Sequence, residues 1–110
     1  MAITKDTEEK IQQLQMFEQS LQSFMMQKQS LQMQLLEAES ALGELGNAEK
    51  AYKIIGNIMI SADKEELQKG LESKKETAEL RIRTIEKQEK TIRDRAAAIQ
   101  KEVLGAIKEE

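Results

Sequence analysis

Apolar residues recur every three or four positions from Leu14 to Leu45, and Lys28 is the only polar residue in this series. Such spacing, sustained over more than four heptads, keeps one narrow face of a helix turned toward a partner helix and is the signature of a coiled coil. The pattern predicts a helix over residues 4–45. With Leu14 at heptad position a, the residues facing the partner (the seam) are Leu14, Phe17, Leu21, Phe24, Lys28, Leu31, Leu35, Ala38, Leu42 and Leu45.

A second helix is predicted over residues 64–108. Gly43, Gly46 and Asn47 end the first pattern, because glycine destabilises a helix interior and readily adopts positive φ at a helix C-terminus. Asp63 and Glu66 then have the spacing of a capping box at a helix start. The seam of this helix consists of Leu71, Lys75, Ala78, Ile82, Ile85, Glu89, Ile92, Ala96, Ile99, Val103 and Ala106.

The two seams have lengths that match when the helices pair antiparallel with Leu42 opposite Leu71. In this register Lys28 lies across from Ile85, about one turn from Glu89. We therefore expect the polar seam residues Lys28 and Glu89 to meet in one layer and to help fix the alignment of the helices.

A short β-hairpin is predicted between the helices, over residues 52–61. Two β-branched runs flank Gly56-Asn57, a spacing typical of a type I′ or type II′ turn. Ile55 then faces Ile58, and side chains alternate between two apolar faces. The hairpin residues are Tyr52, Lys53, Ile54, Ile55, Gly56, Asn57, Ile58, Met59 and Ile60.

This hairpin needs a partner, because two isolated strands are marginally stable in water and their outer edges are unpaired. No third strand is predicted. We expect hairpins from several chains to join into a closed sheet or barrel. The alternative is a hairpin that folds onto its own helix ends in a monomer or simple dimer. The predicted fold is a single, mainly α-helical domain over residues 1–110: an antiparallel two-helix coiled coil with a central β-hairpin that assembles into an oligomeric β-barrel.

Composition supports this interpretation and argues against catalysis. The chain has 39% hydrophobic residues but only two Phe, one Tyr and no Trp, so its core must be thin. A net charge of −3 argues against nucleic acid as a partner. The chain contains neither Cys nor His, and no phosphate-binding loop or metal-spaced cluster is visible. We expect no enzyme activity, cofactor or metal. Without a signal or membrane segment, we expect a soluble cytoplasmic protein.

Some apolar residues lie outside the seam. Between Ile11 and Leu36 the only charged residues are Glu18 and Lys28, and methionine-rich surfaces accommodate many apolar shapes. These residues either bind other proteins or thicken the seam and pack on a neighbouring subunit. The exposed set on the first helix is Met16, Met26, Met33 and Leu36, and the set near the chain ends is Ile3, Ile11, Leu104 and Ile107.

Several short sequences together resemble the beta subunits of the prefoldin family, in particular the archaeal form. They are Gln27-Lys28-Gln29, Tyr52-Lys53-Ile54-Ile55-Gly56, Lys64-Glu65, Leu71, Glu76, Arg81 and Gln88-Glu89. The single hairpin favours the beta type over the alpha type. The chain departs from the family pattern where Gly46-Asn47 replaces a proline between the first helix and the hairpin.

The resemblance implies a hexamer of two alpha-type and four beta-type subunits. It further implies an ATP-independent chaperone (holdase) that captures unfolded proteins and delivers them to a group II chaperonin. The alternative function is a structural scaffold that forms filaments. The residues expected to bind client proteins are Ile3, Ile11, Met16, Leu104 and Ile107, and those expected to contact the chaperonin are Glu102, Glu109 and Glu110.

Overall fold

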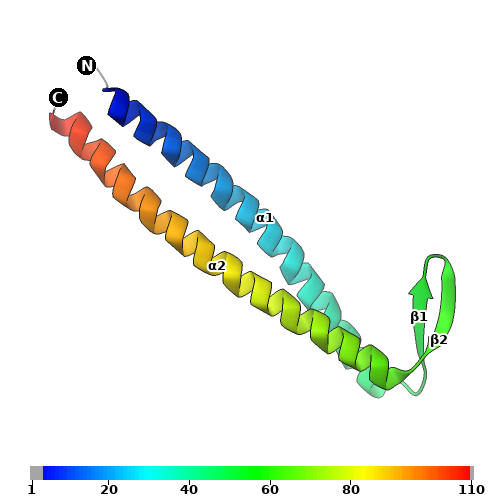
Figure 1. Cartoon of the computed structure of the whole chain (residues 1–110). Helices are drawn as coiled ribbons and strands as arrows, with labels where there is room; N and C mark the ends of the chain where they lie inside the picture. Colours follow the sequence, from blue (N-terminus) through cyan, green and yellow to red (C-terminus); the bar gives the residue numbers. More distant parts are fainter. Residues whose placement is uncertain (1–3, 110) are drawn as a thin grey trace. The chain divides into compact units, whose positions relative to one another are not determined.

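The computed structural model describes residues 4–109 and shows two long helices joined by an antiparallel β-hairpin (Figure 1). Along the chain the elements are α1 (Lys5–Asn47), β1 (Ala51–Ile55), β2 (Ile58–Ala62) and α2 (Lys64–Glu109). The predicted elements and their order are confirmed.

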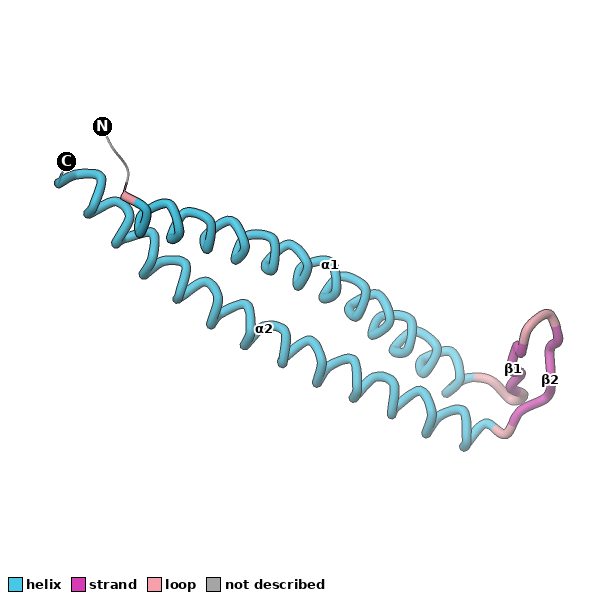
Figure 2. The backbone as a smooth tube through the Cα atoms, turned by 45° about the horizontal axis from the view of Figure 1, so that its top comes forward, coloured by secondary structure: helices cyan, strands magenta, loops and turns pink. Residues whose placement is uncertain are grey.

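The described residues form two compact units. One contains α1 up to Lys28 and α2 from Thr84 onward, and the other contains Gln29–Arg83 with the hairpin. In the first unit the start of α1 and the end of α2 lie side by side (Figures 1 and 2). The extent of the single domain stays a prediction.

The predicted seam is confirmed in both units, because each of its residues is buried or half-buried. In the first unit the seam also reaches further than predicted, to Thr7 and Lys10, which continue the heptad spacing before Leu14. Thr7 is buried, and its backbone N–H donates to the Thr4 side-chain oxygen at 3.2 Å, which caps the start of α1. A search for apolar periodicity misses both residues because they are polar.

The core of the second unit is equally thin. Leu31, Ala38 and Leu45 on α1 and Ala78 on α2 are buried. Leu45 lines the same hollow as Leu67 and Leu71, in keeping with the predicted pairing around Leu71. No side chain in the described part of the chain falls below 2% exposure.

The end of α1 differs from the prediction. The helix continues through Gly43 and Gly46 to Asn47, and neither glycine has positive φ. The last turn is instead tightened by a hydrogen bond from the Ala48 N–H to the Leu45 carbonyl at 3.2 Å. The glycines therefore do not act as the predicted left-handed cap.

A lysine of the second helix caps this end. The Lys64 ammonium donates to the Ala48 carbonyl at 2.9 Å and approaches the Gly46 carbonyl at 3.5 Å. The last turn of α1 has no basic residue of its own. Lys64 therefore supplies the cation that a helix C-terminus favours, from the far side of the hairpin in sequence.

The hairpin has the predicted register, with Ile55 opposite Ile58 and Ile54 opposite Met59. Gly56 has a φ of 60° while Asn57 does not have positive φ. This combination selects the type II′ turn over type I′, which needs positive φ at both positions. The hairpin leads directly into the start of α2.

Asp63 caps α2. Its carboxylate accepts a hydrogen bond from the Glu65 backbone N–H at 3.1 Å, so its predicted role as the N-cap is confirmed. The bond goes to the second helical residue, whereas the capping box predicts a bond to the third, Glu66.

Candidate functional site

The hairpin leaves its apolar side chains uncovered on both faces. Ile54 is 70% exposed and Met59 66% exposed, and they lie opposite each other on one face. Ile55 and Ile58 on the other face are also more than half exposed. The exposed apolar residues of the hairpin are Tyr52, Ile54, Ile55, Ile58, Met59 and Ile60.

The alternative of a hairpin folded onto its own helix ends does not fit this exposure. Within residues 4–109 the only sheet is the two-stranded pair β1–β2, so each strand has one free edge. Among the residues of β1 and β2, only Ala51 at the base of β1 is buried. The hairpin therefore presents exposed apolar side chains and free edges to which further strands can be added.

The turn identifies the backbone groups on each free edge. A two-residue turn makes Ile55 and Ile58 a hydrogen-bonded pair, and such pairs alternate along an antiparallel ladder. The N–H and C=O groups of Tyr52 and Ile54 therefore point outward from β1, and those of Met59 and Ser61 point outward from β2. Both edges can accept another strand.

A buried ion pair interrupts the seam of the first unit. The Lys28 ammonium lies 2.8 Å from one carboxylate oxygen of Glu89, and Arg93 approaches the other oxygen at 3.6 Å. The Glu89 side chain is only 4% exposed. The predicted meeting of Lys28 and Glu89 in one layer is confirmed. That this layer helps to fix the alignment of the helices stays a prediction.

The residues expected to bind clients are partly accessible. Met16 on α1 and Leu104 on α2 are exposed, whereas Ile11 and Ile107 are half-buried at the margin of the seam. All four belong to the first unit. Ile3 lies outside the described residues. Their role in binding stays a prediction.

The residues expected to contact a chaperonin include one that already has a partner. Glu102 forms an ion pair with Lys10 at 3.1 Å, and Lys10 also pairs with Asp6 at 3.1 Å. Hydrogen bonds from Lys10 to Asp6 and then to Glu102 raise the pKa of the Lys10 ammonium. Glu109 ends α2, its side chain is not described, and Glu110 lies outside the described residues.

The outer surface of α1 exposes large apolar side chains, as predicted. Met26 is 70% exposed, and Met16, Met33 and Leu36 are similarly accessible. Since Lys28 is paired with Glu89, Glu18 is the only other charge between Ile11 and Leu36. Met25 and Leu80 are also exposed, although the heptad pattern did not indicate them as surface residues. The methionine run at 25–26 was the available signal for Met25.

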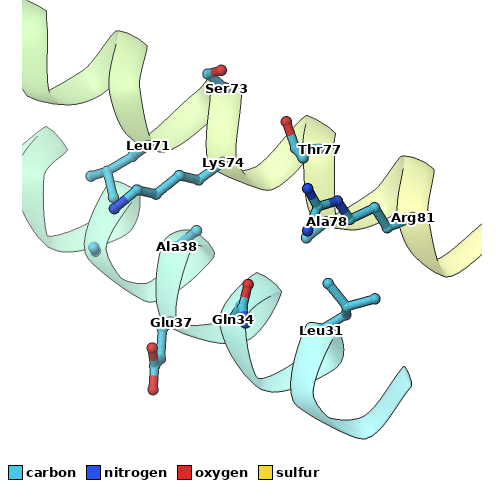
Figure 3. Close-up of a pocket in the computed structure, with 11 residues that line it drawn as sticks. Leu31, Gln34, Glu37, Ala38, Leu71, Ser73, Lys74, Thr77, Ala78 and Arg81 are labelled. Atoms are coloured by element: carbon cyan, nitrogen blue, oxygen red, sulfur yellow. The ribbon is translucent and has the colours of Figure 1, made fainter. Parts of the chain in front are cut away.

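The second unit has a groove between its helices and a hollow at the base of the hairpin. A groove of about 520 Å³ opens between α1 and α2, where Figure 3 shows Leu31 and Ala38 of α1 facing Ala78 of α2. Ser73 and Thr77 of α2 also line this groove. A second hollow, of about 450 Å³, lies at the base of the hairpin.

The described residues contain no grouping of three or more His, Cys, Asp or Glu side chains suited to a metal ion. Across residues 4–109, neither helix has an apolar stretch long enough to cross a membrane.

Comparison with known proteins gives a consistent result. The family model of prefoldin subunits matches residues 8–110. Over 50 residues the chain is 46% identical to the prefoldin subunit beta of Sulfurisphaera tokodaii, which covers 46% of this chain and 40% of that protein. Over 53 residues it is 40% identical to the prefoldin subunit beta of Archaeoglobus fulgidus, which covers 48% of this chain and 46% of that protein. The chain thus aligns with less than half the length of these curated relatives.

A solved structure extends the similarity to the whole fold. The crystal structure of the prefoldin beta subunit from Thermococcus strain KS-1 superposes with a TM-score of 0.87 and 29% sequence identity. The superposition covers 96% of this chain and 95% of that one. The family model spans nearly the entire sequence, and the two helices with their single hairpin agree with it. The chain therefore belongs to the prefoldin subunit family.

Proposed function

We propose that this chain is a beta-type subunit of an ATP-independent holdase that captures unfolded proteins and delivers them to a group II chaperonin. The observation that carries the proposal is a hairpin with apolar side chains exposed on both faces and backbone groups free on both edges. Membership of the prefoldin subunit family and the similarity to beta subunits support the same class.

Assembly proceeds through the hairpin. Alpha-type subunits and further copies of this chain, two alpha with four beta, pair their strands with it and close a shared β-barrel. Closure removes the free edges that otherwise promote aggregation. The strands suit this role, because Lys53 is the only charged residue in β1 and β2.

Client binding uses exposed apolar side chains on the helices. Met16 and Leu104 are the most accessible of the expected residues, and Ile11, Ile107 and Ile3 complete the set. Flexible methionine side chains adapt to apolar segments of differing shape, which suits clients that share only exposed hydrophobicity.

Contact with the chaperonin involves the acidic end of α2. Glu102, Glu109 and Glu110 face a basic surface in this proposal. Glu102 then exchanges or shares its ion pair with Lys10. Since that pair is partly exposed, rearranging it costs little.

An aggregation assay without nucleotide tests the function. A chemically denatured protein is diluted into buffer with this chain alone, with an alpha-type subunit, or with both. The mixture is expected to suppress light scattering. If neither the chain alone nor the mixture suppresses light scattering, the chaperone role is refuted.

Variants locate the client surface in the same assay. Met16→Gln with Leu104→Gln is expected to weaken suppression while helicity stays unchanged. Leu80→Gln is the matched control, since Leu80 is comparably exposed but lies outside the expected set. An equal effect of the double variant and the control contradicts the assignment of Met16 and Leu104.

A scaffold is the second candidate function, because strands with two free edges also permit open-ended addition. A head-to-tail contact forms a ring when the rotation closes and a filament when it does not. Native mass spectrometry of the mixture separates the two, since a hexamer favours the chaperone and open polymers favour the scaffold.

A further inference from the structure

The hollow at the base of the hairpin has an apolar floor. It measures about 450 Å³. Its apolar lining residues are Ala41, Leu45, Ala48, Ala51, Leu67 and Leu71, and Glu44, Tyr52 and Lys53 complete the lining. Leu45 and Ala51 are buried, whereas Ala48, Leu67 and Leu71 are half-buried and accessible from the hollow. An apolar cavity of roughly 150 Å³ already accommodates benzene, so this hollow has room for an aliphatic side chain.

The hollow opens at one edge of the hairpin. Of the two strands only β1 lines it, through Ala51, Tyr52 and Lys53. Consecutive residues of a strand point to opposite faces, so a hollow that includes both Tyr52 and Lys53 meets β1 at its edge. This is the free edge of β1, because β2 occupies the other side.

A strand added at this edge therefore passes over the hollow. The outward N–H and C=O groups of Tyr52 and Ile54 set where the added strand hydrogen-bonds. Tyr52 belongs both to the lining of the hollow and to this edge. The edge and the hollow thus form one continuous surface.

The strand that fits this surface is β2 of another copy. Ile58–Ala62 has no charged residue, which matches an apolar floor. Its free edge carries the backbone groups of Met59 and Ser61. Of these two residues Met59 has the flexible apolar side chain, which is 66% exposed and fills irregular spaces well. A contact between β1 of one copy and β2 of the next is head-to-tail and can repeat around a ring.

We propose that the hollow is a socket that receives the Met59 side chain of a second copy of this chain, when β2 of that copy pairs with the free edge of β1. This inference rests on the proposed assembly of hairpins. It adds that the helix ends, and not the strands alone, bind the neighbouring subunit.

Disulfide cross-linking tests the socket directly, because the chain contains no cysteine. One population carries Ala48→Cys and another carries Met59→Cys, and the two are mixed and oxidised. A disulfide requires Cα atoms within about 7 Å. The expected product is a linked dimer with twice the 12.5 kDa mass of the chain.

The matched control pairs Met59→Cys with Ser73→Cys, since Ser73 is exposed on α2 and lines the other groove. The Ala48→Cys pair is expected to cross-link at least about ten times faster than the control. Equal rates, no cross-link, or a chain that stays monomeric in native mass spectrometry overturns the proposal.

A filled socket gives an independent test. Ala48→Phe is expected to weaken self-association at least about tenfold by occupying the hollow, while Ala48→Ser leaves it unchanged. Circular dichroism checks that helicity is retained. Unchanged self-association of a folded Ala48→Phe variant overturns the socket.

A hairpin variant separates this inference from the proposed function. Ile54→Lys places a charge on the exposed hairpin face and is expected to abolish assembly. If Ile54→Lys has no effect, the assembly proposal itself fails. If Ile54→Lys abolishes assembly and Ala48→Phe does not weaken it, the socket alone fails.

Discussion

Removal of Lys28 from the buried ion pair is expected to destabilise the helix pair strongly. The Lys28→Met change leaves the Glu89 carboxylate 4% exposed and without its partner at 2.8 Å. Arg93 remains at 3.6 Å, but its side chain is 62% exposed and compensates poorly. Loss of one partner of a buried ion pair costs about 3–5 kcal/mol of stability. Because Lys28 is partly exposed, the expected loss in the free energy of unfolding is about 2–3 kcal/mol.

Urea unfolding followed by circular dichroism measures this loss. Protein concentration is held constant, because association adds to the apparent free energy of unfolding. The control is Lys90→Met, which breaks the exposed ion pair with Asp94 at 3.1 Å. That change is expected to cost at most about 0.5 kcal/mol, because solvent screens exposed pairs.

The double variant Lys28→Met with Glu89→Leu completes the test. Replacement of both charges by apolar groups is expected to restore the lost stability or exceed it by about 1–4 kcal/mol. We expect this variant to populate an additional helix alignment or oligomer, visible in native mass spectra. If Lys28→Met costs no more than Lys90→Met, or if the double variant keeps one alignment, the role of the layer in fixing register is refuted.

Three further predictions follow from local contacts. Lys64→Met removes the cation at the end of α1 and is expected to lower the free energy of unfolding in urea by about 0.5–1 kcal/mol. Gly56→Ala places a side chain at a φ of 60° and is expected to cost about 1–2 kcal/mol in the same measurement. Lys10→Met is expected to destabilise the protein at neutral pH, and the destabilisation is expected to shrink progressively above pH 10.5. Urea midpoints measured across this pH range test the expectation.

The direction of the pH effect follows from the raised pKa of Lys10. The ammonium is stabilised by Asp6 and Glu102 in the folded protein, so its contribution is complete below its ordinary pKa of 10.5. The contribution of Lys10 to stability disappears as the pH rises through the pKa that its ammonium has in the folded protein. A difference between wild type and Lys10→Met that stays constant across this range contradicts the assignment.

Controls for the other two variants lie nearby. Lys69→Met removes an exposed lysine from α2 and is expected to leave stability nearly unchanged. Asn57→Ala alters the second turn position, where φ is not positive, and is expected to cost less than Gly56→Ala. If a variant and its control lose equal free energy of unfolding, the proposed cause is contradicted for that variant.

The seam and the hairpin register could be predicted from the sequence because both rest on short-range periodicity. Heptad spacing placed Leu31, Ala38 and Ala78 at the interface, and a two-residue turn fixed Ile55 opposite Ile58. The pairing of Lys28 with Glu89 followed once the two seams were aligned. The seam and the hairpin depend on residues close in sequence, and the ion pair depends only on how the two seams are aligned.

Features that leave no trace in the apolar spacing or in the turn sequence could not be predicted. Gly46 was expected to end α1 in a left-handed cap, but Lys64 caps that end from 18 residues away. Thr7 joins the seam although its polarity hides it from a search for apolar spacing. Of the candidate site, the exposed hairpin was predictable, whereas the hollow beside β1 required the positions of three elements at once.

The absence of any fully buried side chain in residues 4–109 has a consequence for how the protein opens. Because the core is a thin series of layers, separating one layer of the seam breaks only the contacts of that layer, so backbone amides can exchange through local openings. Protection from hydrogen exchange should then be graded along each helix. The slowest amides are expected beside the most buried layers, at Ala38, Ala78 and Glu89, and the fastest at helix ends, where fraying precedes unfolding.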